Sequence, residues 1–321
     1  MAGRDSDTYL QKILTLVESI GEKDTAKLLG VKKTTISRRA YEARKRGVAP
    51  IIGTLSKNLI KIKETYSDDE IAAIAKGGRV SPGLPSMPIA NFNGDVVTFG
   101  VISDTHIGSI YTDNSHILRA FNKFDEAKVD FVVHAGDVTE GLSNRAGHIY
   151  EVNQIGYTAQ KKAAIEILKH CPAQLYMIDG NHDRWYVKGS GAYIVEDIAK
   201  ELGAVYLGQD EGDIALKHHI TLKLWHGEDG NTYAISYRMQ KIVESLTGGT
   251  KPHIIIAGHV HKMMYNWLRH IHCIGAGSIQ MQSKWMRSKR LEAHTGFWVI
   301  KAWLNDTGVG RFQPTWYPLY V

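Results

Sequence analysis

Five short apolar runs beyond residue 95 constrain the fold of this chain most, because each of them ends in a cluster of small and polar residues. They are DVVTFGVIS, VDFVVHAG, AQLYMIDG, ITLKLWHG and PHIIIAGH. Runs of about four to eight β-branched residues between turn signals are typical of buried strands. The segments GYTAQKKAAIEILKH and GAYIVEDIAKEL, which lie between these runs, have helical spacing. The alternation predicts an α/β fold.

The strands come closer together beyond Val205, in the segments ALKHHITLKLWHG, TGFWVIKAWL and RFQPTWYPLYV. NDTGVG separates the last two and is typical of a hairpin turn. We therefore expect antiparallel strands toward the C-terminus, and mixed sheets as a result.

The N-terminal part of the chain is basic. Residues 1–63 hold fourteen Lys and Arg against six Asp and Glu, whereas the whole chain carries only +6. A charge surplus confined to one end predicts a separate module that meets a polyanion.

This basic part has three helical segments, TYLQKILTLVESIG, KDTAKLLG and KKTTISRRAYEARKRG. Small Ala26, Gly30 in a tight turn and apolar Ile36 are typical of a helix-turn-helix unit. The third helix would then contact DNA through its polar side chains, namely Lys33, Thr34, Thr35, Ser37, Arg38, Arg39, Arg44 and Lys45. A small helical bundle that serves packing or dimerisation is the alternative, and a helix-turn-helix unit also makes a homodimer plausible.

We expect three regions: a helix-turn-helix DNA-binding domain over 1–63, a linker with a short helix over 64–94, and an α/β domain over 95–321. Ser67 and Glu70 form a capping-box pattern for a helix that ends at Gly77. No apolar run approaches the ~20 residues that cross a bilayer, and no secretory signal is visible. Two distant cysteines give no disulfide framework. These features favour a cytoplasmic protein without a membrane partner.

Polar side chains that follow the five predicted strands should converge, because ligands bind beyond the carboxyl ends of strands in open α/β sheets. Seven of them are metal-ligand types: Asp104, His106, Asp137, Asn181, His226, His259 and His261. Seven exceed the three protein ligands of a typical catalytic zinc. We expect two divalent ions bridged by Asp137, which would activate a bridging hydroxide for phosphoester hydrolysis.

Strand alternation predicts that His259 and His261 point to one side while Val260 turns away into apolar packing. His218 and His219 lie close enough to compete with His226 for its role, although His226 ends its strand. His134 is expected to be a packing histidine inside a strand. Asp179 precedes Gly180 and could either form a turn or support the site.

The patterns D-x-H, G-D, G-N-H-D, a histidine after an apolar strand, and G-H-x-H, in this order, resemble the calcineurin-like metallophosphoesterase superfamily over about residues 97–280. The resemblance implies a sandwich of mixed sheets flanked by helices. It assigns Asp104, His106, Asp137 and His261 to one metal, and Asp137, Asn181, His226 and His259 to the other.

The resemblance also implies two further roles. His182 would stabilise the transition state or protonate the leaving oxygen, and Asp183 would orient His182. We expect manganese as the activating metal, with iron, zinc and nickel as alternatives.

The substrate is less constrained. GDVTEG lacks the arginine that phosphoprotein phosphatases carry after this motif, and SDTHIG with GNHD is similar to double-strand-break repair nucleases. A substrate wall is expected from two loops, with Asn144, Arg145 and His148 in one and Lys284, Trp285, Arg287, Lys289 and Arg290 in the other. Cations around a tryptophan suit single-stranded nucleic acid, although Trp285 could instead be buried.

These features together predict a metal-dependent phosphodiesterase that cuts DNA and is brought to it by the N-terminal module. The alternatives are a phosphatase or diesterase for a small nucleotide or phosphoprotein, and a DNA-bound regulator with a phosphoesterase body.

Overall fold

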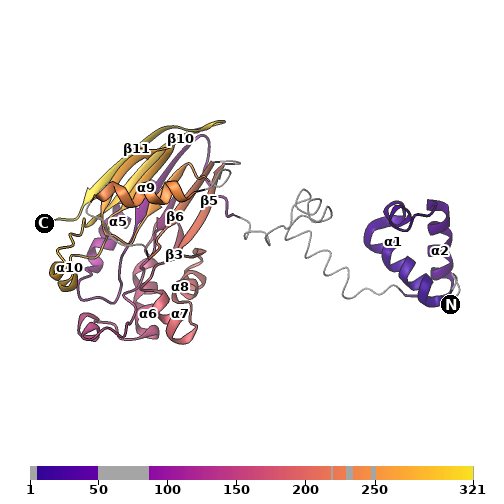
Figure 1. Ribbon diagram of the computed structural model, residues 1–321, viewed down its shortest axis with the longest axis horizontal. Coiled ribbons are helices and arrows are strands. Elements are labelled where there is room, and N and C mark those ends of the chain that lie inside the picture. The colour runs from indigo at the N-terminus through magenta and orange to yellow at the C-terminus, as the bar shows by residue number, and fades with distance from the viewer. Residues whose placement is uncertain (1–5, 50–86, 218–219, 229–233, 247–250, 321) are drawn as a thin grey trace. The chain divides into compact units, whose positions relative to one another are not determined.

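The computed structural model describes residues 6–49, 87–217, 220–228, 234–246 and 251–320. The chain divides into two compact units, and the larger one begins at Met87. Figure 1 shows the elements of both units. The predicted helix at residues 67–77, the boundary at residue 63 and the two competing histidines at 218 and 219 lie outside the described residues.

The smaller unit contains the three predicted helical segments. α1 (Asp7–Leu28) is kinked at Gly21, whose φ of 79° separates its two parts, and α2 (Lys33–Lys45) follows after a turn. Leu10, Ile13, Leu14 and Ile36 pack together with less than 3% of their surface exposed. This core holds the two helices against each other.

The larger unit has two mixed β-sheets, so the predicted fold class is confirmed. One sheet has the order β11-β10-β1-β2-β3-β4 and the other β5-β6-β7-β9-β8. The strands are β1 (Val96–Ile102), β2 (Phe131–His134), β3 (Gln174–Asp179), β4 (Val205–Gln209), β5 (Glu211–Lys217), β6 (Ile220–Trp225), β7 (Ile254–Ala257), β8 (Met263–Leu268), β9 (Ile271–Ala276), β10 (Gly296–Asn305) and β11 (Gly308–Pro318).

Each sheet has a parallel part. Antiparallel strands flank it on both sides in the five-stranded sheet and on one side in the six-stranded sheet, where β4 is a parallel edge strand. β1, β2, β3 and β4 are parallel, as are β6, β7 and β9. The hairpin predicted at NDTGVG joins β10 and β11, which pair from Gly296–Pro318 to Asn305–Gly308. Parallel strands end at the same edge of a sheet, and this edge carries the site described below.

The two sheets pack face to face, and their main core lies between them. Phe99 of β1 and Phe131 of β2 stack there with ring centroids 5.1 Å apart, and they belong to one buried cluster with apolar side chains of the other sheet, such as Ile256. The isoleucine run at residues 254–256 is buried because β7 is central in its sheet.

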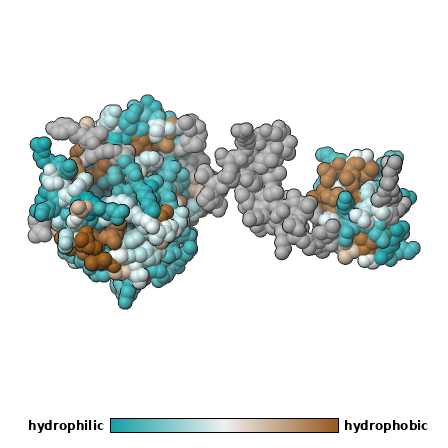
Figure 2. Space-filling view, turned by 60° about the horizontal axis from the view of Figure 1, so that its bottom comes forward, coloured by the Kyte–Doolittle hydropathy of each residue, from teal (hydrophilic) through white to brown (hydrophobic). Residues whose placement is uncertain are grey.

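Helices cover the outer faces of the sandwich. The helices of the larger unit are α5 (Asn114–Glu126), α6 (Tyr157–Leu168), α7 (Arg184–Ser190), α8 (Ile194–Leu202), α9 (Ile235–Ser245), α10 (Lys284–Ser288) and the 3-10 helix η1 (His148–Glu151). α5, α6 and α8 pack on the six-stranded sheet, and α9 packs on the five-stranded one. Figure 2 shows a mainly hydrophilic face of this unit with hydrophobic side chains in a few patches.

The predicted linker ends earlier than expected. Ile89 forms a β-bridge with Ala215, and the backbone N–H of Ala90 donates to Ala215 O at 2.8 Å. Ala90 is also buried in the core between the sheets. The last residues of the predicted linker are thus part of the larger unit. Among the described residues, every helix is too short or too polar to cross a bilayer.

Candidate metal centre

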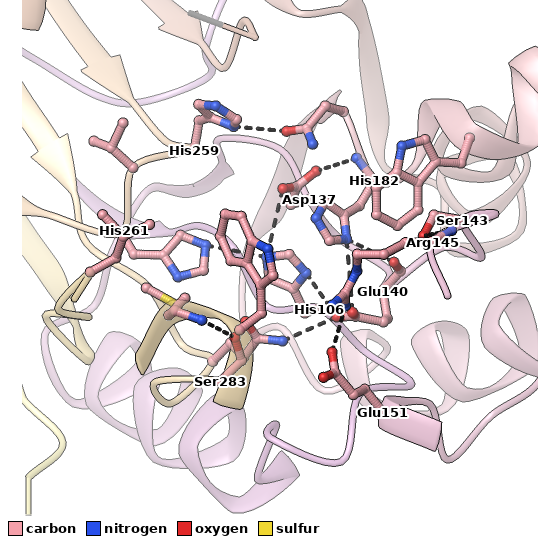
Figure 3. A pocket seen from close by; sticks show the side chains of 17 residues that line it. His106, Asp137, Glu140, Ser143, Arg145, Glu151, His182, His259, His261 and Ser283 are labelled. Atoms are coloured by element: carbon pink, nitrogen blue, oxygen red, sulfur yellow. Dashed lines mark hydrogen bonds and ion pairs between the residues drawn. The ribbon is translucent and has the colours of Figure 1, made fainter. Parts of the chain in front are cut away.

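The structure brings all seven predicted ligands to one edge of the sandwich. Asp104 and Asp137 follow β1 and β2, and Asn181 follows β3 of the same sheet. His226 follows β6, and His259 and His261 follow β7 of the other sheet. Figure 3 labels four of them, His106 and Asp137 from one sheet and His259 and His261 from the other, around one cavity. Only the packing of one sheet on the other creates this cluster.

Three of these side chains form a first group, in which the ligand atoms lie within 4.8 Å of one another: Asp104, His106 and His261. Asp104 Oδ1 lies 3.1 Å from His261 Nε2, and His261 Nε2 lies 3.3 Å from His106 Nε2. Two imidazole nitrogens this close repel each other unless a proton or a cation lies between them. The arrangement fits a cation that both rings could ligate.

A second group contains Asp137, His226 and His259. Asp137 Oδ2 lies 3.2 Å from His226 Nε2, and the Asn181 amide oxygen lies 3.2 Å from His226 Nε2 and 2.8 Å from His259 Nδ1. Asp137 Oδ2 also lies 3.6 Å from His106 Nε2 of the first group. Asp137 therefore lies between the two groups, where a bridging ligand would be.

The backbone at these residues is unusual. Asp104, His106, Asp137, His259 and His261 all have φ between 44° and 75°, a left-handed conformation that costs a non-glycine residue roughly 1–2 kcal/mol. Strained residues of this kind cluster at functional sites, because the surrounding structure must hold them.

This backbone corrects the expected alternation after β7. His259 and His261 are not in an extended segment, and Val260 does not turn into apolar packing but lines a cavity. Both imidazoles still face the cluster, because two left-handed residues turn the chain back toward it.

Glycines before the ligands are required by close packing. A Cβ on Gly180 would collide with the Asp137 carboxylate and backbone nitrogen, and one on Gly136 would collide with the His226 ring. A Cβ on Gly258 would collide with Ser103 and with the Ala135 carbonyl. These three motifs thus need glycine because a side chain there would collide with the end of a neighbouring strand.

Further hydrogen bonds orient the imidazoles. His226 Nδ1 lies 2.7 Å from the Ala135 carbonyl, to which it donates, so its Nε2 faces Asp137. His106 Nδ1 lies 3.0 Å from Glu140 Oε2, and its Nε2 faces the cluster in the same way. The buried guanidinium of Arg238 donates to the carbonyls of His226 and Gly258 at 2.8 and 2.9 Å.

Charges in the cluster compensate one another. Burial by itself raises the pKa of the Asp137 carboxyl, but the nearby His226 and His182 outweigh it and hold that pKa well below its usual range. Burial lowers the pKa of His226, whereas the Asp137 charge and hydrogen bond raise it to about 9. Burial likewise opposes the Glu140 hydrogen bond and charge at His106, whose pKa rises to about 9. Each of these two rings would have to lose a proton before its nitrogen could ligate a metal ion.

His182 lies beside the cluster and faces the cavity, with 23% of its side chain exposed. Its Nδ1 lies 2.8 Å from the Glu140 carbonyl, and its ring packs against Trp185 with centroids 4.0 Å apart. Burial lowers the pKa of His182. The ring is thus held with Nδ1 as the donor and Nε2 free for another partner.

The expected role of Asp183 is corrected. Its carboxylate accepts hydrogen bonds from the backbone N–H groups of Val138, Thr139 and Gly180 at 2.8–3.0 Å, and from the Thr139 hydroxyl. It therefore ties the loop after β2 to the loop after β3, whereas the Glu140 carbonyl orients His182.

Two further polar residues lie at the strand ends. Asp179 accepts a hydrogen bond from the Tyr206 hydroxyl at 3.0 Å. His134 is buried and contacts the Thr105 hydroxyl.

A cavity of about 520 Å³ opens beside the cluster. Of the predicted substrate wall, Arg145 and Trp285 line it, and 44% of Trp285 is exposed. Asn144, Lys284 and Arg287 are exposed but do not line it. His148 is fully buried and contacts Glu140 Oε1 at 2.9 Å, so it supports the site from behind.

Sequence reasoning missed several cavity residues, among them Glu140, Trp185 and Gln280. Glu140 is 4% exposed and contacts His106, His148 and the Gln280 amide. Its position three residues after Asp137, in GDVTEG, was the available signal. Gln280 comes from a distant loop, and no sequence pattern marks it.

Fold and site define a class of α/β proteins with a buried acid and imidazole cluster at the strand ends. Residues 97–290 match the family described as "Calcineurin-like phosphoesterase superfamily domain". The chain belongs to this superfamily, as the sequence motifs predicted. The family implies a metal-dependent hydrolase of phosphoesters, and the cluster fits a site for divalent metal ions.

Individual relatives are distant. The DNA polymerase II small subunit of Methanothermobacter thermautotrophicus is 22% identical over 75% of this chain, which spans 60% of that protein's length. An archaeal phosphodiesterase structure is 16% identical, with a TM-score of 0.39, and covers 69% of this chain and 100% of its own. Zinc-bound Vps29 from Entamoeba histolytica is 13% identical, with a TM-score of 0.37, and covers 69% of this chain and 99% of its own.

Gly180→Ala should weaken Mn²⁺ binding by about tenfold or more, because the added Cβ displaces Asp137. Isothermal titration of chelator-treated protein with MnCl₂ measures this. Gly189→Ala is the matched control, since nothing lies within 4 Å of a Cβ on Gly189. Equal affinities of the two variants would contradict the crowding argument.

Proposed function

We propose that this protein is a two-metal phosphodiesterase that cuts DNA, with a helix-turn-helix unit at its N-terminus. The observation that carries the proposal is the cavity beside the metal cluster, in which Arg145 and the exposed Trp285 stand with His182. A cation can bind a phosphate and an indole can stack on a base. The relative from Methanothermobacter thermautotrophicus is a subunit of a DNA polymerase, which supports a DNA-related role.

In this proposal, Asp104, His106, Asp137 and His261 hold one ion, and Asp137, Asn181, His226 and His259 hold the other. When bound, such a pair supplies the charge that activates a water molecule near neutral pH and stabilises the phosphoryl oxygens. The mixed carboxylate, amide and imidazole donors suit manganese, iron, zinc or nickel, and we propose manganese.

The chain's own groups position the substrate and move a proton. Arg145, which pairs with Glu151 at 2.6 Å, faces the cavity and can take a phosphate of the strand. His182 donates from Nδ1 to the Glu140 carbonyl, so that Nε2 faces the substrate. In this role Nε2 would take up a proton from solvent and give it to the leaving oxygen as the P–O bond breaks. Burial lowers the pKa of the ring, which makes its protonated form the stronger acid.

The helical unit offers a cationic face for DNA. Lys33, Thr34, Arg38, Arg44 and Lys45 are exposed on α2, as the proposal requires. Ser37 and Arg39 were expected to face DNA, but both are half-buried. Ser37 donates a hydrogen bond to Glu22, and Arg39 donates one to the Tyr9 hydroxyl within the same unit. Thr35 is also half-buried. We therefore propose that Arg38 and Lys45, seven residues apart on one helix face, contact the phosphates.

Asp137→Asn should lower Mn²⁺-dependent cleavage of bis-p-nitrophenyl phosphate and of end-labelled DNA by about a hundredfold or more, since the shared ligand loses its charge. DNA binding measured by gel shift should be retained. Asp125→Asn, which removes an exposed carboxylate paired with Lys128, is the control. Turnover of the monoester p-nitrophenyl phosphate alone would contradict a diesterase.

His182→Ala should leave the metal content normal and lower turnover by about 10²- to 10⁴-fold, because a proton donor is lost. The decrease should be smallest for substrates with a good leaving group such as p-nitrophenolate. Metal analysis and a series of aryl phosphodiesters measure both effects. Loss of metal from this variant would refute the proposed role.

Arg38→Gln combined with Lys45→Gln should weaken duplex DNA binding and reduce the slope of log K against log salt by about 0.9 for each phosphate that the protein no longer neutralises. Lys128→Gln combined with Lys169→Gln removes the same charge from exposed positions just after α5 and α6 of the larger unit. If both double variants weaken DNA binding equally, the effect is one of net charge and not of contacts made by α2.

A further inference from the structure

A second cavity of about 640 Å³ lies on the larger unit, between the β8–β9 hairpin and the β10–β11 turn. Its lining includes Lys251, Trp267, Arg269, His270, Arg311 and Phe312, which we call the hairpin surface. None of the seven proposed metal ligands lines it. The hairpin surface is therefore separate from the metal centre, and the proposed reaction does not use it.

Aromatic side chains form a platform at this surface. Trp267 on the edge strand β8 is 62% exposed, and of the seven tryptophans in the chain only Trp267 and Trp285 are classed as exposed. Trp267 pairs in register with His272, which stacks on Phe312 at 4.2 Å with an interplanar angle of 18°. Tyr265, two residues before Trp267, stacks on the same Phe312 ring. Strands β8 and β9 of one sheet and β11 of the other thus bring flat rings together.

Positive charge surrounds the platform. Lys251, Arg269 and Arg311 line the cavity, and its lining contains no Asp or Glu. Asp306 of the β10–β11 turn is not part of the lining. Within the described part of the chain, these three cations have no ion pair with a carboxylate. The Arg311 guanidinium lies 4.3 Å from the Trp303 ring centroid, which holds it flat at the surface.

The hairpin turn itself is unusual. Arg269 and His270 form a two-residue connection between β8 and β9 with φ values of 48° and 68°. Turns with two positive φ angles favour Asn-Gly, because larger side chains are strained there. Here two large side chains occupy the turn instead, and both are exposed at the mouth of the cavity.

We propose that the hairpin surface binds single-stranded DNA, with a base stacked on Trp267 and phosphates contacted by Arg269, Lys251 and Arg311. Cations beside exposed rings are the combination that single strands use, since their bases are free to stack. A duplex hides these base faces and would meet only the cations. The choice of DNA over RNA rests on the proposed function. The binding of a single strand rests on the pattern of rings and charges alone.

Fluorescence anisotropy of the full-length protein tests the proposal, with a labelled oligothymidylate of about eight nucleotides. Chelator in the buffer prevents cleavage. Trp267→Ala should weaken binding by about fivefold to a hundredfold, as expected for the loss of one stacked base. Arg269→Gln should reduce the salt slope by about 0.7. Tyr193→Ala, which truncates an exposed ring beside α8, should bind as the wild type does.

Three results would overturn the proposal. The first is that Trp267→Ala binds the oligonucleotide with wild-type affinity. The second is that binding is lost in Trp285→Ala alone, which would place the strand at the metal cavity. The third is that oligoglutamate displaces the oligonucleotide as effectively as unlabelled DNA does. Tighter binding of oligouridylate would overturn the choice of DNA.

Hydrolysis of bis-p-nitrophenyl phosphate separates this proposal from the proposed function. Trp267→Ala should hydrolyse this small diester at the wild-type rate, because Trp267 does not line the metal cavity. Oligonucleotide binding that depends on Trp267, in a protein that hydrolyses no diester, would support the hairpin surface and contradict the nuclease. The reverse pattern would support the nuclease alone.

Discussion

The crowding of carboxylates and imidazoles around Asp137 is the interaction on which the rest of the structure depends. Asp137 is 2% exposed, and its carboxylate lies against rings from both sheets. A buried charge is costly unless it is paired, so the two sheets must stay in register for the cluster to exist. The sandwich core, which includes Phe99, Phe131 and two isoleucines of β7, Ile254 and Ile256, keeps that register.

The same crowding explains the local backbone. Five of the proposed ligands adopt left-handed conformations, and the glycines beside them leave no space for a Cβ. Each strained residue costs roughly 1–2 kcal/mol, which the packed core and the hydrogen bonds of Asp183 and Arg238 must offset. Stability is thus given up at the strand ends in exchange for the close approach of the ligand atoms.

The exposed tryptophans give the larger unit two distinct surfaces. Trp285 lines the metal cavity with Arg145, and Trp267 lies among Lys251, Arg269 and Arg311 without any metal ligand nearby. In our proposals, one surface holds the strand that is cut and the other holds a strand without cutting it. A protein that must keep hold of DNA after cleavage would use such a division.

The sequence by itself determined the elements and the ligand types. Apolar runs ending in polar clusters predicted the strands, and the order of five motifs predicted the superfamily that residues 97–290 match. Some predictions depend only on one residue and its place in the chain, and they needed no tertiary information. The choice of His226 as a ligand, because it ends its strand, is an example.

Only the tertiary structure decided which side chains meet across the sheets. Glu140 and Gln280 lie 140 residues apart and join at 3.1 Å, and Asp183 bonds the loop after β2 rather than its neighbour His182. His259 and His261 face the cluster through left-handed residues, not through strand alternation. Local patterns fix the conformation of a strand, but not the packing of two sheets or the turns at their ends. That packing set the geometry of this site.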